Sequence, residues 1–262
     1  MPETEVALVT GGAQRIGRSL VLDLAARGAS VAIHCHGSRD AAEALAADVR
    51  SLDCEAAVLQ ADLLDRAAVR ALVPAAARAL GRGLTVLVNN AAIFEHDTLL
   101  GATDESWDRH IGVNLHAPFL LTQAFAAQAP KAGLDAEGEP VARACVVNII
   151  DQRVMKPTPE FMTYSIAKAG LWAFTRTAAQ ALAPDLRVNA IGPGPTLRGT
   201  RQSEAHFAGQ RAATVLNRGA SPAEICAAMR YLLDAPGVTG QLICVDGGQH
   251  LGWQTPDARG VE

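Results

Sequence analysis

Residues 6–17, which read VALVTGGAQRIG, decide the fold of this chain. The stretch begins with apolar, partly β-branched residues, passes through Gly11, Gly12 and Gly17, and continues into an Ala- and Leu-rich segment. This pattern predicts a strand, a tight turn and a helix whose N-terminus favours a phosphate. Because a Gly-rich turn also occurs as a purely structural feature, its meaning depends on the rest of the chain.

Six further apolar segments alternate with helical patterns along the chain. We expect strands at residues 6–10, 30–35, 55–62, 84–90, 144–150, 186–194 and 241–248, and helices at 15–27, 39–51, 65–80, 104–128, 163–182 and 221–233. Strands that are apolar throughout are typical of a sheet covered on both faces. The sequence therefore predicts an α/β fold: one Rossmann-type, doubly wound parallel sheet of about seven strands with helices on both faces.

Two segments interrupt this alternation. Residues 131–140, KAGLDAEGEP, are rich in Gly, Pro and acidic residues and are expected to form an exposed loop. Residues 194–217 carry no firm strand pattern and lie where ligands bind in such folds, so they read either as a substrate lid or as an ordinary surface connection. We otherwise expect one domain over residues 1–262.

Composition narrows the class of partner. The formal net charge is −4 and no Lys/Arg stripe is present, which argues against nucleic acid. No apolar run approaches the roughly 20 residues of a membrane span. The first strand follows the N-terminus closely, so we expect a cytoplasmic protein without a signal segment. Five scattered cysteines fit free thiols better than disulfides or a metal site. The sequence thus predicts a small-molecule site.

The end of the second strand indicates the cofactor. An acidic residue there usually binds the ribose 2′-hydroxyl of NAD. Here the strand ends HCHGSRD, with His34, His36, Ser38 and Arg39, and Arg15 is expected nearby in the Gly-rich turn. A basic and hydroxylic pocket suits a 2′-phosphate, so NADP(H) is favoured. The two histidines lack Cys or carboxylate partners at ligand spacing, so no metal is expected.

A tyrosine and a lysine supply the candidate chemistry. Tyr164 and Lys168 are four residues apart on a predicted helix and therefore share one face. A nearby ammonium is expected to lower the pKa of the phenol and to prepare Tyr164 to donate a proton near neutral pH.

These features together resemble the short-chain dehydrogenase/reductase family. The matching positions are the turn TGGAQRIG, Asp62 after the third strand, the NNA segment at Asn89, Asn90 and Ala91, the helix asparagine Asn114, the Tyr164/Lys168 pair and the Pro193-Gly194 loop. Arg15 replaces the usual middle glycine of the turn, and Asp151 replaces the usual serine. Both changes are similar to the pteridine reductase and dihydromonapterin reductase branch, as are Phe94 and the ending VTGQLICVDGGQHL. Gly37 and Ala92 depart from that branch, and Gly37 weakens the expectation of NADP selectivity.

The resemblance implies roles for individual residues. Asp151, Tyr164, Lys168 and Asn114 would form the catalytic set, and Phe94 would stack on a pterin held by Asp151 and Tyr164. A homotetramer is also implied. The implied cofactor contacts are Gly11, Arg15, Ile16, Gly17, His34, His36, Ser38, Arg39, Asp62, Leu63, Asn90, Ala91, Lys168, Pro193 and Gly194.

Asp151 suggests the substrate. An ionised carboxylate at about 4 Å from a developing alkoxide would cost roughly 4 kcal/mol at an effective dielectric constant near 20, or about three orders of magnitude in rate. A ring C=N in a dihydropterin avoids this penalty, since it takes a proton on nitrogen. We therefore expect NADPH-dependent reduction of a dihydropterin of the dihydromonapterin or dihydrobiopterin type, with weak dihydrofolate reduction.

Two other functions remain open: a carbonyl or alcohol oxidoreductase with a protonated or outward-facing Asp151, and a non-catalytic NADP sensor. Intact Tyr164, Lys168 and Asn114 disfavour the sensor. Several residues also have purely structural readings. These readings are Phe94 as a core or rim aromatic, Asp62 as a helix N-cap, Asn114 as a backbone bridge, and His250 and Trp253 as interface residues.

Overall fold

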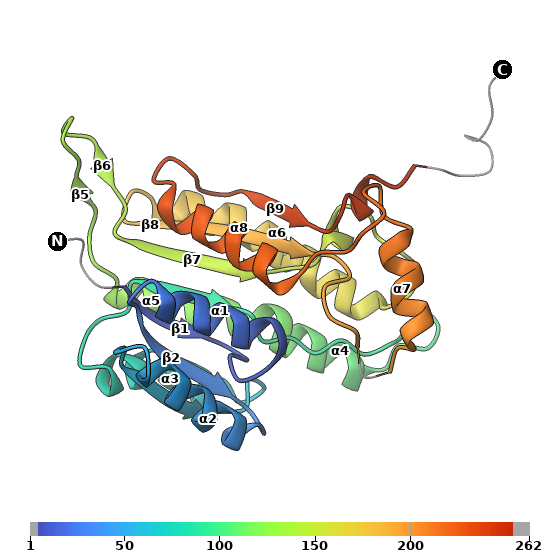
Figure 1. Cartoon of the computed structure of the whole chain (residues 1–262), viewed down its shortest axis with the longest axis horizontal. Coiled ribbons are helices and arrows are strands. Elements are labelled where there is room, and N and C mark those ends of the chain that lie inside the picture. Colours follow the sequence, from blue (N-terminus) through green and yellow to red (C-terminus); the bar gives the residue numbers. More distant parts are fainter. Residues whose placement is uncertain (1–4, 200, 254–262) are drawn as a thin grey trace.

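Seven parallel strands form one continuous sheet in the computed structural model, which describes residues 5–199 and 201–253. The order across the sheet is β3-β2-β1-β4-β7-β8-β9 (Figure 1). The strands are β1 (Val6–Val9), β2 (Ser30–Cys35), β3 (Ala56–Gln60), β4 (Val86–Asn89), β7 (Ala144–Ile149), β8 (Leu186–Pro193) and β9 (Leu242–Val245). This is the predicted Rossmann-type arrangement, in which the chain switches direction between β1 and β4.

Helices cover both faces of the sheet, as the uniformly apolar strands predict. One face packs against α1 (Arg15–Ala26), α2 (Arg39–Arg50) and α8 (Pro222–Asp234), and the other against α3 (Arg66–Ala79), α5 (Ala117–Gln128) and α6 (Met162–Leu182). Strand β1 shows the division: Ala7 and Val9 belong to the first core, and Val6 and Leu8 to the second. Each predicted helix lies within two residues of its expected bounds.

Three local features were not predicted. The expected helix at residues 104–128 is divided into α4 (Asp104–Ile111), the π-helical turn η1 (Gly112–His116) and α5. The expected loop at residues 131–140 contains a small hairpin, β5 (Gly133–Leu134) and β6 (Pro140–Val141), which projects beyond the sheet (Figure 1). Residues 194–217 contain the helix α7 (Glu204–Ala212), which buries none of its residues and so has no apolar periodicity to detect.

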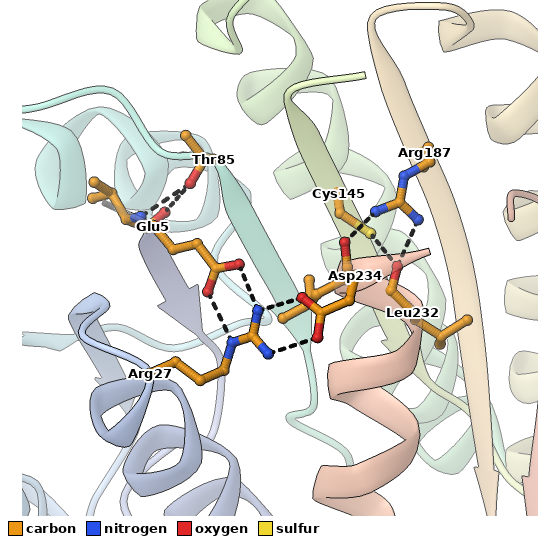
Figure 2. A network of polar contacts seen from close by, with 9 residues as sticks. Glu5, Arg27, Thr85, Cys145, Arg187, Leu232 and Asp234 are labelled. Atoms are coloured by element: carbon orange, nitrogen blue, oxygen red, sulfur yellow. Dashed lines mark hydrogen bonds and ion pairs between the residues drawn. The ribbon is translucent and has the colours of Figure 1, made fainter. Parts of the chain in front are cut away.

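The two ends of the strands differ in chemistry. At the amino ends, the guanidinium of Arg27 bridges Glu5 and Asp234, and the guanidinium of Arg187 donates to the carbonyl oxygens of Leu232 and Leu233 at the end of α8 (Figure 2). The residues expected to form a site follow the carboxyl ends, where ligands bind in doubly wound sheets. Within the described ranges, no helix combines the length and hydropathy needed to cross a membrane.

Candidate active site

The Gly-rich turn packs tightly against the ends of β1 and β4. Gly11 adopts a left-handed backbone conformation, with φ of +59°, and its carbonyl oxygen accepts a hydrogen bond from Asn90 Nδ2 at 3.0 Å. A Cβ atom at Gly17 would lie 2.1 Å from the carbonyl oxygen of Gly11. No side chain fits there, so Gly17 lets the first turn of α1 lie directly against the loop.

This turn fits the phosphates of a dinucleotide. The first amides of a helix have no partner within the helix, and a side-chain cap would normally bind some of them. At the N-cap of α1, Gln14 makes no side-chain hydrogen bond to these amides in the described structure. The amides of the first turn, which includes Ile16 and Gly17, thus remain able to bind a pyrophosphate through hydrogen bonds and the helix dipole.

Arg15 lies in the Gly-rich turn, as predicted, and its side chain extends toward the segment after β8. Its backbone also has a positive φ of 54°, which accounts for the glycine that is usual at this position in the resembling family. The guanidinium donates to the carbonyl oxygens of Leu197 and Arg198, each at 3.0 Å. Arg15 therefore connects the turn to the segment after β8, and its contact with a 2′-phosphate stays a prediction.

His34 lies behind the turn and has no ring nitrogen left for a phosphate. The side chain is buried; Nδ1 accepts a hydrogen bond from the amide of Gly11 at 3.1 Å, and Nε2 lies 3.1 Å from the carbonyl oxygen of Ala61. These partners require a neutral imidazole protonated on Nε2, and burial lowers the pKa of His34 accordingly. His34 therefore supports the Gly-rich turn from behind and does not contact the cofactor directly as predicted.

The region after β2 offers exposed polar groups for the ribose end of a cofactor. His36 Nδ1 lies 3.6 Å from the carboxylate of Asp62, and Arg39 lies 3.6 Å from Glu43 one helical turn further on. Ser38 stands at the N-cap of α2. His36 and Arg39 are exposed and can turn toward a 2′-phosphate, and Ser38 is half-buried beside them.

The alternative reading of Asp62 as a helix cap is wrong. The N-cap of α3 is Asp65, whose carboxylate accepts from the amide of Ala67 at 2.8 Å. Asp62 instead accepts from the amide of Leu64 at 2.9 Å and faces His36. The side chain of Leu63, between Asp62 and Leu64 in the sequence, is buried in the core beneath this loop.

Asp151, Tyr164 and Lys168 come together at the ends of β7 and α6. The hydroxyl of Tyr164 donates to Asp151 Oδ2 at 2.8 Å, and the other carboxylate oxygen accepts from the amide of Arg153 at 2.8 Å. Lys168 is 2% exposed, and its Nζ donates to the carbonyl oxygen of Ile149 at 2.8 Å. The carboxylate predicted to replace a serine thus points into the site and contacts the tyrosine directly.

Burial moves all three groups away from their charged forms. It raises the pKa of Asp151, although hydrogen bonds from Arg153 and Tyr164 oppose the shift. It also raises the pKa of Tyr164, and the adjacent Asp151 adds to this rise. It lowers the pKa of Lys168 to about 8. The expectation that Lys168 lowers the pKa of Tyr164 is therefore wrong: Lys168 Nζ lies 5.9 Å from the ring centroid, whereas Asp151 contacts the hydroxyl.

Asn114 forms a backbone bridge in the described structure. Its Oδ1 accepts from the amide of Ile93 at 2.9 Å, and its Nδ2 donates to the carbonyl oxygen of the same residue at 2.9 Å. The residue lies in the π-helical turn η1, which shifts the register of the helix where the side chain must reach the loop after β4. This is the structural reading of Asn114, and it fixes the loop that carries Phe94.

Phe94 is a surface platform and not a core aromatic. The residue is 43% exposed, and its ring stacks on Phe161 with centroids 4.2 Å apart. The ring of Tyr164 packs against it edge to face, with centroids 4.7 Å apart. Sequence analysis missed both Phe161 and Arg153, whose guanidinium lies 5.0 Å from the Phe161 centroid and 5.7 Å from that of Phe94. An aromatic residue three positions before Tyr164 was the available signal for the first of them.

A buried polar network, also missed, holds this platform against α6. Asp97 is 6% exposed and accepts hydrogen bonds from the amide and the hydroxyl of Thr163. The same hydroxyl lies 2.7 Å from Nδ1 of His110, which is fully buried. Because the N-cap residue of α6, Phe161, offers no side-chain cap, Asp97 caps this helix from a distant part of the chain.

The segment after β8 contacts both β9 and the loop that carries Phe94. The amide of Gly194, which follows Pro193, donates to the carbonyl oxygen of Val245 at 3.0 Å, and a Cβ atom at Gly194 would lie 2.6 Å from Asp246. Further along, the guanidinium of Arg201 donates to the carbonyl oxygen of Phe94. Ala91, like Asn90, follows β4 and bonds through its amide to the hydroxyl of Thr10.

The family follows from comparison with known proteins. A family model described as enoyl-(acyl carrier protein) reductase matches residues 11–250. This chain belongs to the short-chain dehydrogenase/reductase family. It is accordingly an oxidoreductase, and the predicted resemblance is confirmed at the level of the family.

Individual relatives fall into two groups. The chain is similar to two crystal structures titled FolM alternative dihydrofolate reductase 1 in complex with NADP. The Brucella suis structure is 43% identical, with a TM-score of 0.90, and the match covers 98% of this chain and 99% of that one. The Brucella canis structure is 42% identical, with a TM-score of 0.91, and the match covers 99% of each chain. A 3-oxoacyl-acyl-carrier-protein reductase of Synechocystis is 34% identical and covers 93% of this chain and 96% of that protein.

Proposed function

We propose that this chain is an NADPH-dependent reductase of dihydropterins, of the dihydromonapterin or dihydrobiopterin type with weaker activity on dihydrofolate. The observation that carries the proposal is the hydrogen bond of 2.8 Å between Tyr164 and the half-buried carboxylate of Asp151, with the ring centroids of Tyr164 and the exposed Phe94 4.7 Å apart. A flat aromatic platform beside a proton-holding pair suits a planar, nitrogen-containing ring. The similarity to the two Brucella proteins supports the same substrate class.

Asp151 and Tyr164 can act together on a ring nitrogen. Bound NADPH would supply the hydride to the ring carbon. Tyr164 gives its hydroxyl proton to the ring nitrogen, while the carboxylate of Asp151, which accepts from that hydroxyl at 2.8 Å, also accepts from N–H groups of the ring. Lys168, held on Ile149, adds a positive charge that stabilises the tyrosinate formed. After the hydride has arrived, Asp151 takes a proton from solvent and passes it to the phenolate oxygen, and its raised pKa favours this uptake.

The cofactor choice rests on the residues around the turn. The amides of the first turn of α1 would hold the pyrophosphate, and His36, Ser38 and Arg39 would bind the 2′-phosphate, with Lys168 on the nicotinamide ribose. The complexes of both Brucella relatives with NADP agree with this preference. We also propose a homotetramer, a cytoplasmic location and a lid function for residues 194–217 as the family resemblance implies.

Reduction of a ketone remains the second candidate, because a relative at 34% identity is a 3-oxoacyl reductase. Asp151 is the residue that separates the two functions. A carboxylate held at the hydroxyl of Tyr164 would repel a developing alkoxide, whereas a ring nitrogen that is protonated before the hydride arrives develops no negative charge there. A sensor without turnover has no use for a buried proton-holding pair.

The test is the oxidation of NADPH, followed by absorbance, against dihydropterins and simple activated ketones. We expect kcat/KM for at least one dihydropterin to exceed that for each ketone by 100-fold or more, in line with the loss of about three orders of magnitude expected from a repelled alkoxide. Faster turnover of ketones would refute the proposal in favour of the carbonyl reductase. No turnover of either class, with tight NADPH binding, would favour the sensor.

A further inference from the structure

Tyr164, the proposed proton donor, is the third residue of α6 and so lies in its first turn. The amides of a first turn have no partner inside the helix, and helix ends open more easily than helix centres. Within the described residues, the N-cap residue Phe161 makes no side-chain hydrogen bond to these amides. It also has a φ of +57°, a strained conformation for a bulky residue. The residues next to Tyr164 in the sequence therefore do little to hold this turn.

Asp97 supplies the missing cap from 66 positions earlier in the chain. Its Oδ1 accepts a hydrogen bond from the amide of Thr163 at 3.2 Å, and its Oδ2 accepts one from the hydroxyl of the same residue. The main-chain carbonyl oxygen of Asp97 accepts from the amide of Phe161 at 2.8 Å. The helix dipole favours a carboxylate at this end. The residue directly before Tyr164 is thus bound through both its backbone and its side chain.

His110 binds the same hydroxyl from the other side. Its Nε2 accepts from the amide of Glu95 at 3.2 Å, so the proton is on Nδ1. Nδ1 lies 2.9 Å from the carbonyl oxygen of Ser106 and 2.7 Å from Oγ1 of Thr163. The hydroxyl of Thr163 then accepts from His110 and donates to Asp97. All three side chains are buried, so loss of any one bond would leave a buried polar group unpaired.

The ring of Tyr164 also contacts His110. The two ring centroids are 6.1 Å apart and the ring planes meet at 75°, an edge-to-face arrangement. A second edge-to-face contact, with Phe94, has centroids 4.7 Å apart. The hydroxyl of this ring reaches Asp151 at 2.8 Å. Supports of the helix turn and of the ring therefore fix the position of the reacting hydroxyl.

We infer that Asp97 and His110 are positioning residues for the proton donor, and that both act through Thr163. They hold the first turn of α6 so that the hydroxyl of Tyr164 stays against Asp151 and can reach the substrate. Because a displacement of about 1 Å can cost 10²-fold in rate, loss of this support should lower kcat. The inference rests on the proposed function, since it takes Tyr164 as the donor.

The substrate platform has separate supports. The carbonyl oxygen of Phe94 accepts from the guanidinium of Arg201, and Asn114 bonds to both backbone groups of Ile93. Binding of the substrate ring should therefore survive the loss of the network that holds Tyr164. This difference predicts a fall in kcat without a matching rise in KM.

Thr163→Val tests this split, because it removes the shared hydroxyl and keeps the size of the side chain. We expect kcat for the best dihydropterin to fall about 10-fold or more, with KM and the Kd of NADPH within about 2-fold of wild type. Thr163→Ser returns the hydroxyl and should recover most of kcat. Asp97→Ala should lower kcat at least as far as Thr163→Val. A rise in KM with kcat unchanged would assign the network to the platform and overturn the inference.

Asp65→Ala is the matched control. Asp65 caps α3 in the same way, accepting from the amides of Ala67 at 2.8 Å and Ala68 at 3.2 Å, but it does not contact α6. Its loss should lower Tm and leave kcat unchanged. If Asp97→Ala and Thr163→Val also melt at lower temperature but turn over as fast as wild type, the network serves stability alone and the inference is wrong. Should Asp97→Ala not fold, the two Thr163 variants decide.

A titration of the phenol separates this inference from the proposed function. The chain has two tyrosines, so Tyr231→Phe leaves Tyr164 as the only one. Burial and the contact with Asp151 raise the pKa of Tyr164. Adding Thr163→Val should lower that pKa toward the ordinary value near 10, because the hydroxyl leaves the carboxylate and gains water. Ultraviolet absorbance measured against pH without substrate records the change, and circular dichroism shows the range in which the fold persists.

The titration and the kinetics have distinct outcomes. A lowered pKa in the Thr163→Val protein supports the inference even if no dihydropterin is reduced, in which case the proposed function alone fails. Identical titration curves with and without Thr163→Val would show that the network does not place the hydroxyl of Tyr164. The inference would then be overturned while dihydropterin reduction by the wild type would still support the proposed function.

Discussion

The ionisable groups at the two ends of the sheet have opposite environments. At the amino ends of the strands, Arg27 bonds to Glu5 and Asp234, and these contacts raise the pKa of Arg27 and lower that of Asp234 (Figure 2). At the carboxyl ends, burial raises the pKa of Asp151 and lowers that of Lys168. The first set of contacts favours the ionised groups, and the second environment opposes them.

This difference separates stability from chemistry. Charged groups that satisfy each other contribute to folding and have little tendency to exchange protons. Groups held against their charged forms lower stability but have protons to give or accept near neutral pH. Changes at the carboxyl end should therefore alter catalysis strongly, and changes at the amino end should alter only stability. The following predictions test this division, from the largest expected effect to the smallest.

Tyr164→Phe should have the largest effect. The variant loses the hydroxyl that donates to Asp151 and, as proposed, to the substrate, so kcat should fall by about 10³-fold or more. NADPH affinity, measured by fluorescence titration, should change little, because the cofactor contacts proposed above do not involve this hydroxyl. Turnover within 10-fold of wild type would remove Tyr164 from the proton-transfer step.

Lys168→Met should abolish activity and yet stabilise the fold at neutral pH. The pKa of Lys168 is about 8 in the folded chain against 10.5 ordinarily. Below pH 8 the amino group of Lys168 is charged in both the folded and the unfolded chain. The buried charge then lowers the free energy of unfolding by about 3 kcal/mol. Between pH 8 and pH 10.5 the unfolded chain binds more protons than the folded chain does, so the stability of the wild type rises with pH across this window.

Urea unfolding of both proteins at pH 7 and pH 10.5 measures this effect. The variant should be more stable by about 2 kcal/mol at pH 7, after subtracting about 1 kcal/mol for the lost hydrogen bond to Ile149. The difference should shrink or reverse at pH 10.5. If the variant were less stable than wild type by the same amount at both pH values, the burial of the charged Lys168 would not lower the stability of the fold.

Arg27→Ala should have the smallest effect and leave catalysis unchanged. The side chain is 24% exposed, and its ion pairs are partly screened, so we expect a loss on the order of 1 kcal/mol in the free energy of unfolding. Arg18→Ala is the matched control, since Arg18 and Asp48 are each about half exposed and should contribute less. A large fall in kcat/KM for Arg27→Ala would contradict the separation of the two ends.

The sequence predicted features that depend on local or strictly periodic patterns. Apolar strands, helix bounds and the close packing at Gly17 are of this kind, because each follows from residues near one another in the chain. The Tyr164–Asp151 contact was also foreseeable, since the family resemblance places both residues in one catalytic set.

The remaining features depend on contacts between distant segments. Whether Tyr164 faces Lys168 or Asp151 determines the direction of its pKa shift, and helical spacing alone does not show it. The side chain of Arg15 turns toward residues 197–198, and Asp97 caps a helix 65 residues further along the chain. The helix α7 buries no residue and therefore leaves no periodic signal.

The central claim is that Asp151 adapts this fold to a ring C=N, and Asp151→Ser tests it most directly. The variant and wild type are assayed with the best dihydropterin and with an activated ketone, and thermal melting confirms that the variant is folded. We predict a loss on the order of 10²-fold for the dihydropterin, because one acid–base participant is gone. Activity on the ketone should be unchanged or higher, because a hydroxyl donor replaces a repelling carboxylate. An equal loss for both substrates in a folded variant would contradict the account.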